Sequence, residues 1–416
     1  MNSIMRKFAV GATALGLTGL AACASGTSTG TGGAAPGSVT LKVWVMGDSG
    51  TNFSKLLKDF TASSGIHVTV QAIPWANVNE KLTTAVASGN GPDITQIGLS
   101  QLPEFISSGA LMDISSQVAK DSAFADSNFI SGFASADLNP AGKVLSVPWI
   151  SDTRVLFYRT DILSQAGISG PPTTLAQMQA DAVKLAARGS GKYGYYIPQW
   201  DNPLPIEFAW SMGGGITDAG GKVDFDTPAF KQAVDYYAAY YRQKLVPTAS
   251  DFDQTVGLVS GSAPMLISGP YEAQALKTQA PQLNGKWAVA PIPAGTSSTA
   301  LLAGSTLGVW KNSANVAADM KLLSYLEQPS TQVKWYALDG DLPSATAALS
   351  DPSLSGDPDG QVYVKALQTA KLLPLVPAWD KIQTDMLNDL NKIVLSGADE
   401  NATLSQLNAD VAGLQN

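Results

Sequence analysis

Hydrophobic and polar positions change their period several times along the first hundred residues. They alternate over 39–45 and 66–73, which is typical of strands. Helical spacing covers 52–63 and 77–88, and a short apolar run follows at 93–97. This order of strand, helix, strand, helix and strand predicts a mostly parallel sheet with helices on both faces. We expect its ligands to bind at the carboxyl ends of the strands.

A second block of elements begins near residue 144. The pattern predicts strands over 144–147 and 155–158, separated by the segment 148–152. The small pair Ala303-Gly304 interrupts an apolar run before a further strand over 305–310. No fixed-period repeat is visible, which disfavours solenoids and propellers. Helical spacing indicates further helices over 175–187, 226–244, 315–328 and 331–338, and the last hundred residues are largely helical. In the helix over 226–244, Asp226 or Thr227 can cap the start, Pro228 fits the first turn, and the tyrosines at 237 and 241 are expected in the core.

Composition narrows the range of partners. The chain has 26 Lys and Arg against 34 Asp and Glu, a formal net charge of −8 and a pI near 4.7. No basic cluster is visible, so we expect no nucleic acid, because phosphate binding needs clustered Lys and Arg. Trp and Tyr number nine and twelve. Each combines an apolar face with a polar edge, so we expect some of them to face a ligand.

The amino-terminal segment has the layout of an export signal. Two basic residues precede the apolar run 8–20, which is too short to span a bilayer as a helix. Leu20-Ala21-Ala22-Cys23 resembles the lipobox of bacterial lipoproteins, and Cys23 is the only cysteine of the chain. The prediction is a signal peptide over 1–22 and a lipidated N-terminus with a flexible tether over 23–38. The alternative is that Cys23 is an incidental small apolar residue.

Few catalytic groups are available. His67 is the single histidine, in an alternating segment that predicts a solvated position on a strand. One histidine and one lipid-bearing cysteine leave no Ser-His-Asp triad, no Cys-His pair and no His-based zinc site. The segment 357–360 lacks the later ligands of an EF-hand and indicates a turn, so no metal and no cofactor are expected. Hydrolysis by two carboxylates stays open, and the same acids suit hydrogen bonds to sugar hydroxyls; the candidates are Asp48, Asp152, Asp201, Glu207 and Glu272.

A series of ordered landmarks then resembles a known family. They include LKVWVMGDSG, SGNGPDITQIG, SVPWISDTRVLFYRTDILSQAGISGPPTT, GKVDFDTPAFKQAVDYY, APMLISGPYE, WAVAPIPAG, GSTLGVWKNS and LPLVPAW. Together they are similar to the extracellular solute-binding proteins of bacterial ABC importers, of the maltose/trehalose-type sugar-binding family. The resemblance implies an α/β, two-lobed, periplasmic-binding-protein-like fold with hinge crossings and a ligand cleft between the lobes. It also implies lobe 1 over 39–150 plus 306–350 and lobe 2 over 151–305 plus 351–416.

The same resemblance carries binding roles to individual positions. Ser100 and Gln101 fall where relatives often have Asp, Trp or Arg, so the chemistry of that subsite departs from the family. Some positions have structural alternatives: helix capping for Asp48 and Ser49, an ion pair with Arg154 for Asp152, and core packing for Trp379. The implied ligand-binding residues are Asp48, Ser49, Asn79, Ser100, Gln101, Asp152, Trp200, Asp201, Tyr271, Gly304, Ser305 and Trp379.

The function implied is capture of a di- or oligosaccharide and its delivery to the transmembrane subunits of an ABC permease. Among candidate ligands, α-glucosides are preferred over β-linked or amino sugars. Ligand favours closure through its higher affinity for the closed lobes, with hinges near 150–153, 304–307 and 351–360. We expect a monomer outside the cytoplasm, lipid-anchored to the outer face of the cell membrane. The alternatives are a secreted two-carboxylate glycoside hydrolase and a binding protein that feeds a sensor.

Overall fold

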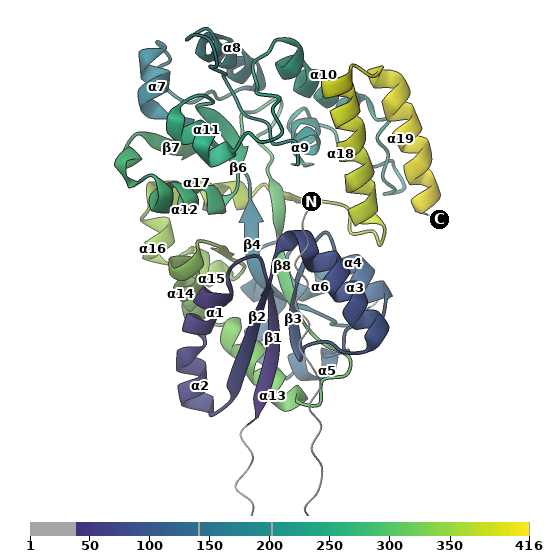
Figure 1. Cartoon of the computed structure of the whole chain (residues 1–416). Coiled ribbons are helices and arrows are strands. Elements are labelled where there is room, and N and C mark those ends of the chain that lie inside the picture. The colour runs from purple at the N-terminus through teal and green to yellow at the C-terminus, as the bar shows by residue number, and fades with distance from the viewer. Residues whose placement is uncertain (1–38, 140–141, 201–202, 416) are drawn as a thin grey trace, which may run out of the picture. The chain divides into compact units, whose positions relative to one another are not determined.

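The larger of two β-sheets is mixed rather than mostly parallel. The computed structural model describes residues 39–139, 142–200 and 203–415 (Figure 1), which belong to one compact unit. The first three strands are parallel, as predicted, whereas β8 pairs antiparallel with β3 on one side and with β4 on the other. The strand order is β2-β1-β3-β8-β4-β9, with β10 beside β8. The strands are β1 (Thr40–Met46), β2 (His67–Ile73), β3 (Ile94–Gly98), β4 (Val147–Thr153), β8 (Leu301–Val309), β9 (Leu342–Pro343) and β10 (Lys371–Leu372).

The second sheet has the order β6-β5-β7 and is antiparallel. Only Arg154 separates the end of β4 from the start of β5, so the chain passes from one sheet directly into the other. We call the part built on the larger sheet the large-sheet lobe and the part built on the smaller sheet the small-sheet lobe. The strands of the second sheet are β5 (Val155–Arg159), β6 (Met265–Ser268) and β7 (Trp287–Ala290).

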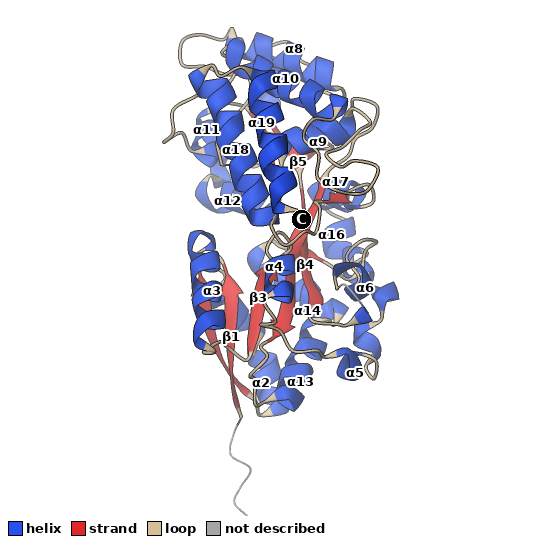
Figure 2. Cartoon of the chain, turned by 90° about the vertical axis from the view of Figure 1, so that its right-hand side faces the viewer, coloured by secondary structure: helices blue, strands red, loops and turns tan. Residues whose placement is uncertain are grey.

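Helices surround both sheets (Figure 2). The large-sheet lobe has α1 (Gly50–Leu56), α2 (Lys58–Ser64), α3 (Val78–Ser88), α4 (Leu102–Ser107), α5 (Ser115–Val118), α6 (Ser135–Leu138), α13 (Val316–Leu326), α14 (Pro329–Asp339) and α15 (Thr346–Leu349). The chain then returns through α16 (Pro352–Ser355) and α17 (Pro358–Leu367). The small-sheet lobe has α7 (Thr160–Gln165), α8 (Leu175–Ala186), α9 (Leu204–Ser211), α10 (Pro228–Arg242), α11 (Gln254–Ser260), α12 (Pro270–Gln279), α18 (Trp379–Ser396) and α19 (Glu400–Leu414).

Two predicted breaks in strands are wrong. Strand β4 runs through Pro148, which the sequence pattern assigned to a connecting segment, and the register with β8 shifts between Pro148 and Ile150. This irregularity accommodates a residue without an N–H group. Strand β8 likewise runs through Ala303-Gly304 without interruption. Apart from this irregularity, the two strands pair from Val147 to Thr153 and carry the chain toward the small-sheet lobe.

Aromatic packing fixes the core of the large-sheet lobe. Phe53 of α1 meets Trp149 of β4 and Trp335 of α14 edge-on, with ring centroids 5.9 and 5.6 Å apart. All three side chains are almost fully buried. Edge-to-face contacts of this kind add about 1 kcal/mol each to the burial of apolar area. They hold the first helix and the last long helix of this lobe against the same strand.

Helix α10 confirms its prediction in detail. The Thr227 side chain accepts a hydrogen bond from the Phe230 amide at 3.2 Å, and Pro228 occupies the first turn. Tyr237 and Tyr241 of this helix are buried, as predicted for core residues.

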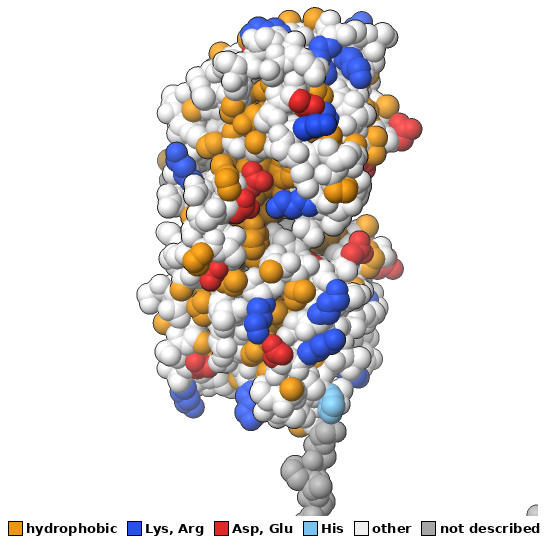
Figure 3. All heavy atoms as spheres, turned by 90° about the vertical axis from the view of Figure 1, so that its left-hand side faces the viewer, with side chains coloured by type: hydrophobic (Ala, Val, Ile, Leu, Met, Phe, Trp, Pro, Cys, Tyr) orange, Lys and Arg blue, Asp and Glu red, His pale blue; other side chains and the backbone are white. Residues whose placement is uncertain are grey.

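The space-filling view shows apolar, acidic and basic side chains interspersed over one face (Figure 3). The histidine side chain is exposed there, as predicted for His67. Within the described ranges, every helix is too short or too polar to cross a lipid bilayer.

Candidate functional site

A cavity of about 630 Å³ lies where the two lobes face each other. It is lined from the large-sheet lobe by the loop after β1 and the ends of β3, β4 and β9, and from the small-sheet lobe by α12 and α18. A second hollow of about 800 Å³, lined by residues between Val118 and Val144, contains none of the predicted binding residues.

The structure brings most of the predicted residues to this cavity. Asp201 and Cys23 lie outside the described residues. Asn79 and Gln101 do not line the cavity, although both were expected to contact the ligand. Their side chains are hydrogen-bonded to each other instead, Gln101 Nε2 donating to Asn79 Oδ1 at 2.8 Å. The predicted residues that line it are Asp48, Ser49, Ser100, Asp152, Trp200, Tyr271, Gly304, Ser305 and Trp379.

Two further acids line the cavity, Asp339 and Asp341, and sequence reasoning missed both. Asp339 accepts hydrogen bonds from Ser49 Oγ at 2.7 Å and from Asn52 Nδ2 at 2.9 Å. Ser49 precedes α1 but makes no side-chain capping bond, so its hydroxyl orients Asp339. Asp341 accepts from Trp335 Nε1 at 3.1 Å.

Burial, followed by the negative charges of Asp339 and Asp152, raises the pKa of Asp341 well above its ordinary value. The raised pKa lessens the repulsion between these neighbouring carboxyl groups. Their oxygens can accept hydrogen bonds from ligand hydroxyls.

Asp152 combines the two roles that the sequence left open. It forms an ion pair with Arg154, with 2.5 Å between Oδ2 and Nη1, and it also lines the cavity. Its Oδ1 atom is buried and has no hydrogen-bond partner among the described residues. A buried acceptor without a donor is costly, so this oxygen suits a ligand hydroxyl.

Three aromatic side chains at the cavity are unusually exposed. Trp75 is 53%, Trp200 56% and Tyr271 40% exposed, and they come from three distant segments of the chain. The Arg154 guanidinium lies 5.7 Å from the Tyr271 ring centroid. Large apolar rings left open in one cavity suit a ligand that has flat apolar faces.

Trp75, which sequence reasoning missed, packs closely against two glycines. A Cβ added to Gly47 would lie 3.0 Å from Trp75 Nε1, and one added to Gly98 would lie 3.4 Å from the ring. These glycines end β3 and follow β1, so the indole lies over the carboxyl ends of two parallel strands. The signal available in the sequence was the Pro74-Trp75 pair directly after the alternating segment.

Backbone close to the crossing strands forms another wall. Gly304 has φ +136, and a Cβ there would lie 2.1 Å from the Ile150 carbonyl oxygen. Beside it, Ser305 Oγ accepts from Gln96 Nε2 at 2.7 Å. The buried Trp379 reaches the cavity from α18, and its Nε1 has no hydrogen-bond partner among the described residues.

Comparison with known proteins decides the family. Residues 44–333 match the family of bacterial extracellular solute-binding proteins. The chain belongs to this family. It is 26% identical over 369 residues to a binding protein of Brucella abortus, covering 86% of this chain and 88% of that one. It is also 25% identical over 363 residues to the diacetylchitobiose-binding protein DasA of Streptomyces coelicolor, covering 83% and 82%.

The fold of this solute-binding protein agrees with that assignment. The sugar-binding protein MalE of Xanthomonas citri superposes with a TM-score of 0.82 at 29% identity, covering 91% of this chain and 97% of that one. The predicted two-lobed α/β fold is thereby confirmed.

Two of the acids considered for hydrolysis support the fold of the solute-binding protein instead. Glu207 is buried and accepts from the Leu301 amide at 2.8 Å. Glu272 is buried and accepts from Gln254 Nε2 at 2.6 Å. Burial raises the pKa of Glu272, and its two side-chain hydrogen bonds act against that rise. Neither acid lines the cavity.

Proposed function

We propose that this solute-binding protein binds a di- or oligosaccharide in the cavity between its lobes and delivers it to the transmembrane subunits of an ABC importer. The observation that carries the proposal is the gathering of three exposed aromatic rings and four carboxyl groups, those of Asp48, Asp152, Asp339 and Asp341, around one cavity. Sugar rings have apolar faces for the aromatic side chains and hydroxyls for the carboxyls. Relatives that bind a sugar and diacetylchitobiose support the same ligand class.

The proposed mechanism uses both lobes. An open cavity offers Asp48, Trp75 and Asp339 from the large-sheet lobe, and closure adds Tyr271 and Trp379 from the small-sheet lobe. A ligand that contacts both sets binds the closed state more tightly than the open state, so it shifts the population toward closure. The permease would then recognise the closed, loaded form.

We further propose that Cys23 carries a lipid that keeps the protein at the outer face of the membrane, with residues 24–38 as the tether. The support is the lipobox-like segment and the absence of large apolar side chains in that stretch. A single acyl chain gives only marginal membrane binding, so stable retention requires a second acyl chain or another membrane-binding signal.

The test is a thermal-shift screen of the purified chain with maltose, maltotriose, trehalose and N,N′-diacetylchitobiose. Glutamine, a tripeptide and spermidine serve as controls from other ligand classes. A ligand that binds only the folded state raises the melting temperature with its concentration. A shift with at least one sugar is expected. A shift with a control compound and with no sugar would contradict the proposal.

The same samples separate binding from hydrolysis. After overnight incubation with the sugar that gives the largest shift, the sugar is expected to be recovered intact. New reducing ends above those in a heat-inactivated sample would contradict a purely binding role.

A further inference from the structure

Four side chains form a hydrogen-bonded chain between the two lobes. Gln101 Nε2 donates to Asn79 Oδ1, and Asn79 Nδ2 donates to Asp380 Oδ2. Gln383 Nε2 donates to the other carboxylate oxygen of Asp380 at 2.8 Å. Asn79 belongs to α3 and Gln101 precedes α4 in the large-sheet lobe, whereas Asp380 and Gln383 belong to α18, which packs on α10 and α19 in the small-sheet lobe.

The direction of every bond in this chain is fixed by chemistry. An ionised carboxylate only accepts, so Asp380 requires the NH₂ group of Asn79 to point toward it. The carbonyl oxygen of Asn79 then points away and accepts from Gln101. Gln101 is 7% exposed, so its amide is held inside the large-sheet lobe and aligned for Asn79. The four groups thus form a preorganised donor that faces a preorganised acceptor across the lobes.

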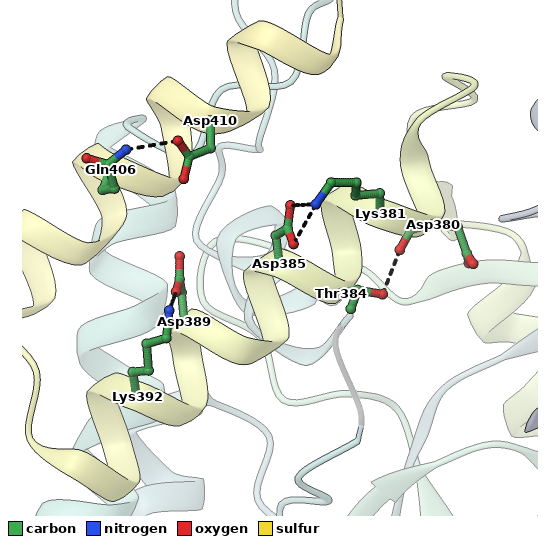
Figure 4. A network of polar contacts seen from close by, with 8 residues as sticks. All are labelled: Asp380, Lys381, Thr384, Asp385, Asp389, Lys392, Gln406 and Asp410. Atoms are coloured by element: carbon green, nitrogen blue, oxygen red, sulfur yellow. Dashed lines mark hydrogen bonds and ion pairs between the residues drawn. The ribbon is translucent and has the colours of Figure 1, made fainter.

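The contact lies beside the cavity without belonging to its ligand-contacting wall. Trp379 and Gln383, on the same turn of α18 as Asp380, line the cavity, whereas Asn79, Gln101 and Asp380 do not. Figure 4 shows the Asp380 side chain projecting away from the Lys381–Asp385 ion pair, which lies elsewhere on α18. Closure of the cavity and formation of the Asn79–Asp380 bond therefore bring together the same helices.

We propose that Gln101, Asn79, Asp380 and Gln383 form a latch that stabilises the closed state and sets the affinity for all ligands by a common factor. The part of this proposal that concerns affinity rests on the proposed function, because it assumes that a sugar binds in the cavity. Asn79 and Asp380 are positioning residues, because they act through the relative placement of the lobes. A protein whose binding-competent state is less populated binds each ligand more weakly by the same factor.

A neighbouring carboxyl group, that of Glu104, makes the latch depend on the amide donor of Asn79. Burial, followed by the negative charge of Asp380, raises the pKa of Glu104 on α4. The carboxylate of Glu104 therefore opposes the approach of α18, and the amide donor of Asn79 offsets this repulsion. Replacing that donor with a third carboxylate should separate the helices.

The first test measures lobe separation without any ligand. Spin labels at Ser107→Cys on α4 and Asn388→Cys on α18, both exposed, report the distance between the lobes in a Cys23→Ser background. Asn79→Asp is expected to move the distance distribution to longer values. The reversed pair Asn79→Asp with Asp380→Asn should restore it, because the amide introduced on α18 can then donate to the carboxylate introduced on α3. Asp385→Asn is the matched control on α18 and should leave the distribution unchanged.

The latch is overturned if Asn79→Asp leaves the native distribution unchanged, or if the reversed pair fails to restore it. A general loss of folding would appear as a lower melting temperature in the single variant and in the reversed pair alike. This experiment stands whether or not the ligand is a sugar, so its failure is distinguishable from failure of the proposed function.

The second test measures affinity by isothermal titration with two sugars from the thermal-shift panel. Asn79→Asp is expected to raise the Kd for both sugars at least tenfold and by the same factor, mainly through faster dissociation. The reversed pair should return both Kd values to within about threefold of native. A change in the ratio of the two Kd values would contradict the latch, because it would mean that Asn79 contacts the ligand.

Discussion

Single exposed side chains at the cavity carry the recognition we propose, and Trp75 gives the clearest case. The Trp75→Ala change should weaken binding of the panel sugar about tenfold, or roughly 1.4 kcal/mol, because one ring face loses its apolar partner. The ligand-free melting temperature should stay near native, since a half-exposed ring over Gly47 and Gly98 contributes little to the core. Titration calorimetry and thermal unfolding measure the two quantities.

Two control variants frame that result. Trp75→Phe keeps an aromatic face and should retain most of the affinity. Val256→Ala removes another exposed apolar side chain, outside the cavity, and should change neither quantity. Equal sugar affinities of the native protein and the Trp75→Ala variant would show that this ring does not contact the ligand.

Gly304 is the residue whose backbone conformation the site depends on most. Gly304→Ala should destabilise the ligand-free fold by about 3 kcal/mol or more, because φ +136 disfavours a side chain and the new Cβ would meet the Ile150 carbonyl. Urea unfolding gives the free energy. The matched control is Gly413→Ala on α19, where a Cβ meets nothing within 4 Å and up to about 1 kcal/mol should be gained. Equal effects of both changes would contradict the argument.

Regular local patterns predicted the elements well, and long-range pairing decided where they failed. Alternation located β1 and β2, and Thr227 with Pro228 located the start of α10, because these signals are local. The sequence pattern did not predict the middle of β4, because Pro148 normally ends a strand and only the bulge against β8 makes a proline acceptable there. At the site, no motif marks Asp339, which ends α14, or Asp341, which follows the helix. The approach of Asp339 to Ser49 spans 290 positions in the sequence.

The junction between β3 and α13 contains an acid whose protonation should set a pH dependence. Burial raises the pKa of Asp319 to about 6, and its hydrogen bond with Ser313 acts against that rise. Between about pH 4 and pH 6, the folded state therefore keeps a proton on Asp319 that the unfolded state, with a pKa of about 4, has already lost. This group stabilises the fold fully below about pH 4, and that contribution disappears as the pH rises through about 6.

Asp319→Asn should therefore raise the free energy of unfolding by about 2 kcal/mol at pH 8 and leave it unchanged at pH 4. Asparagine can donate to Ser313 Oγ, whose hydroxyl then donates to Asp93 Oδ1, now 3.0 Å away. Urea titrations between pH 4 and 8 measure the effect. Asp251→Asn, at an exposed aspartate, should show no such trend. An equal gain at pH 4 and pH 8 would contradict the protonation argument.

At the scale of the whole molecule, the two lobes have different roles in the proposed cycle. The large-sheet lobe presents Asp48, Trp75 and the Asp339–Asp341 pair on rigid strand and helix ends. The small-sheet lobe presents Tyr271 and Trp379 at the starts of α12 and α18. Because the chain passes between lobes at β4 to β5 and at the start of β8, a rotation there moves these two sets as units.

Membrane retention should depend on the sulfur of Cys23 and not on the residues of the cavity. In cells that express the full chain, Cys23→Ala should move the protein from the membrane fraction to the soluble fraction, because lipid attachment needs the thiol. Ser25→Ala, two positions away, should stay with the membrane. The Kd of the released variant for the panel sugar should equal that of the native chain, since Asp48 to Trp379 remain unchanged. Fractionation followed by titration measures both outcomes, and persistence of Cys23→Ala in the membrane fraction after a high-salt wash would assign retention to something other than a lipid on this residue.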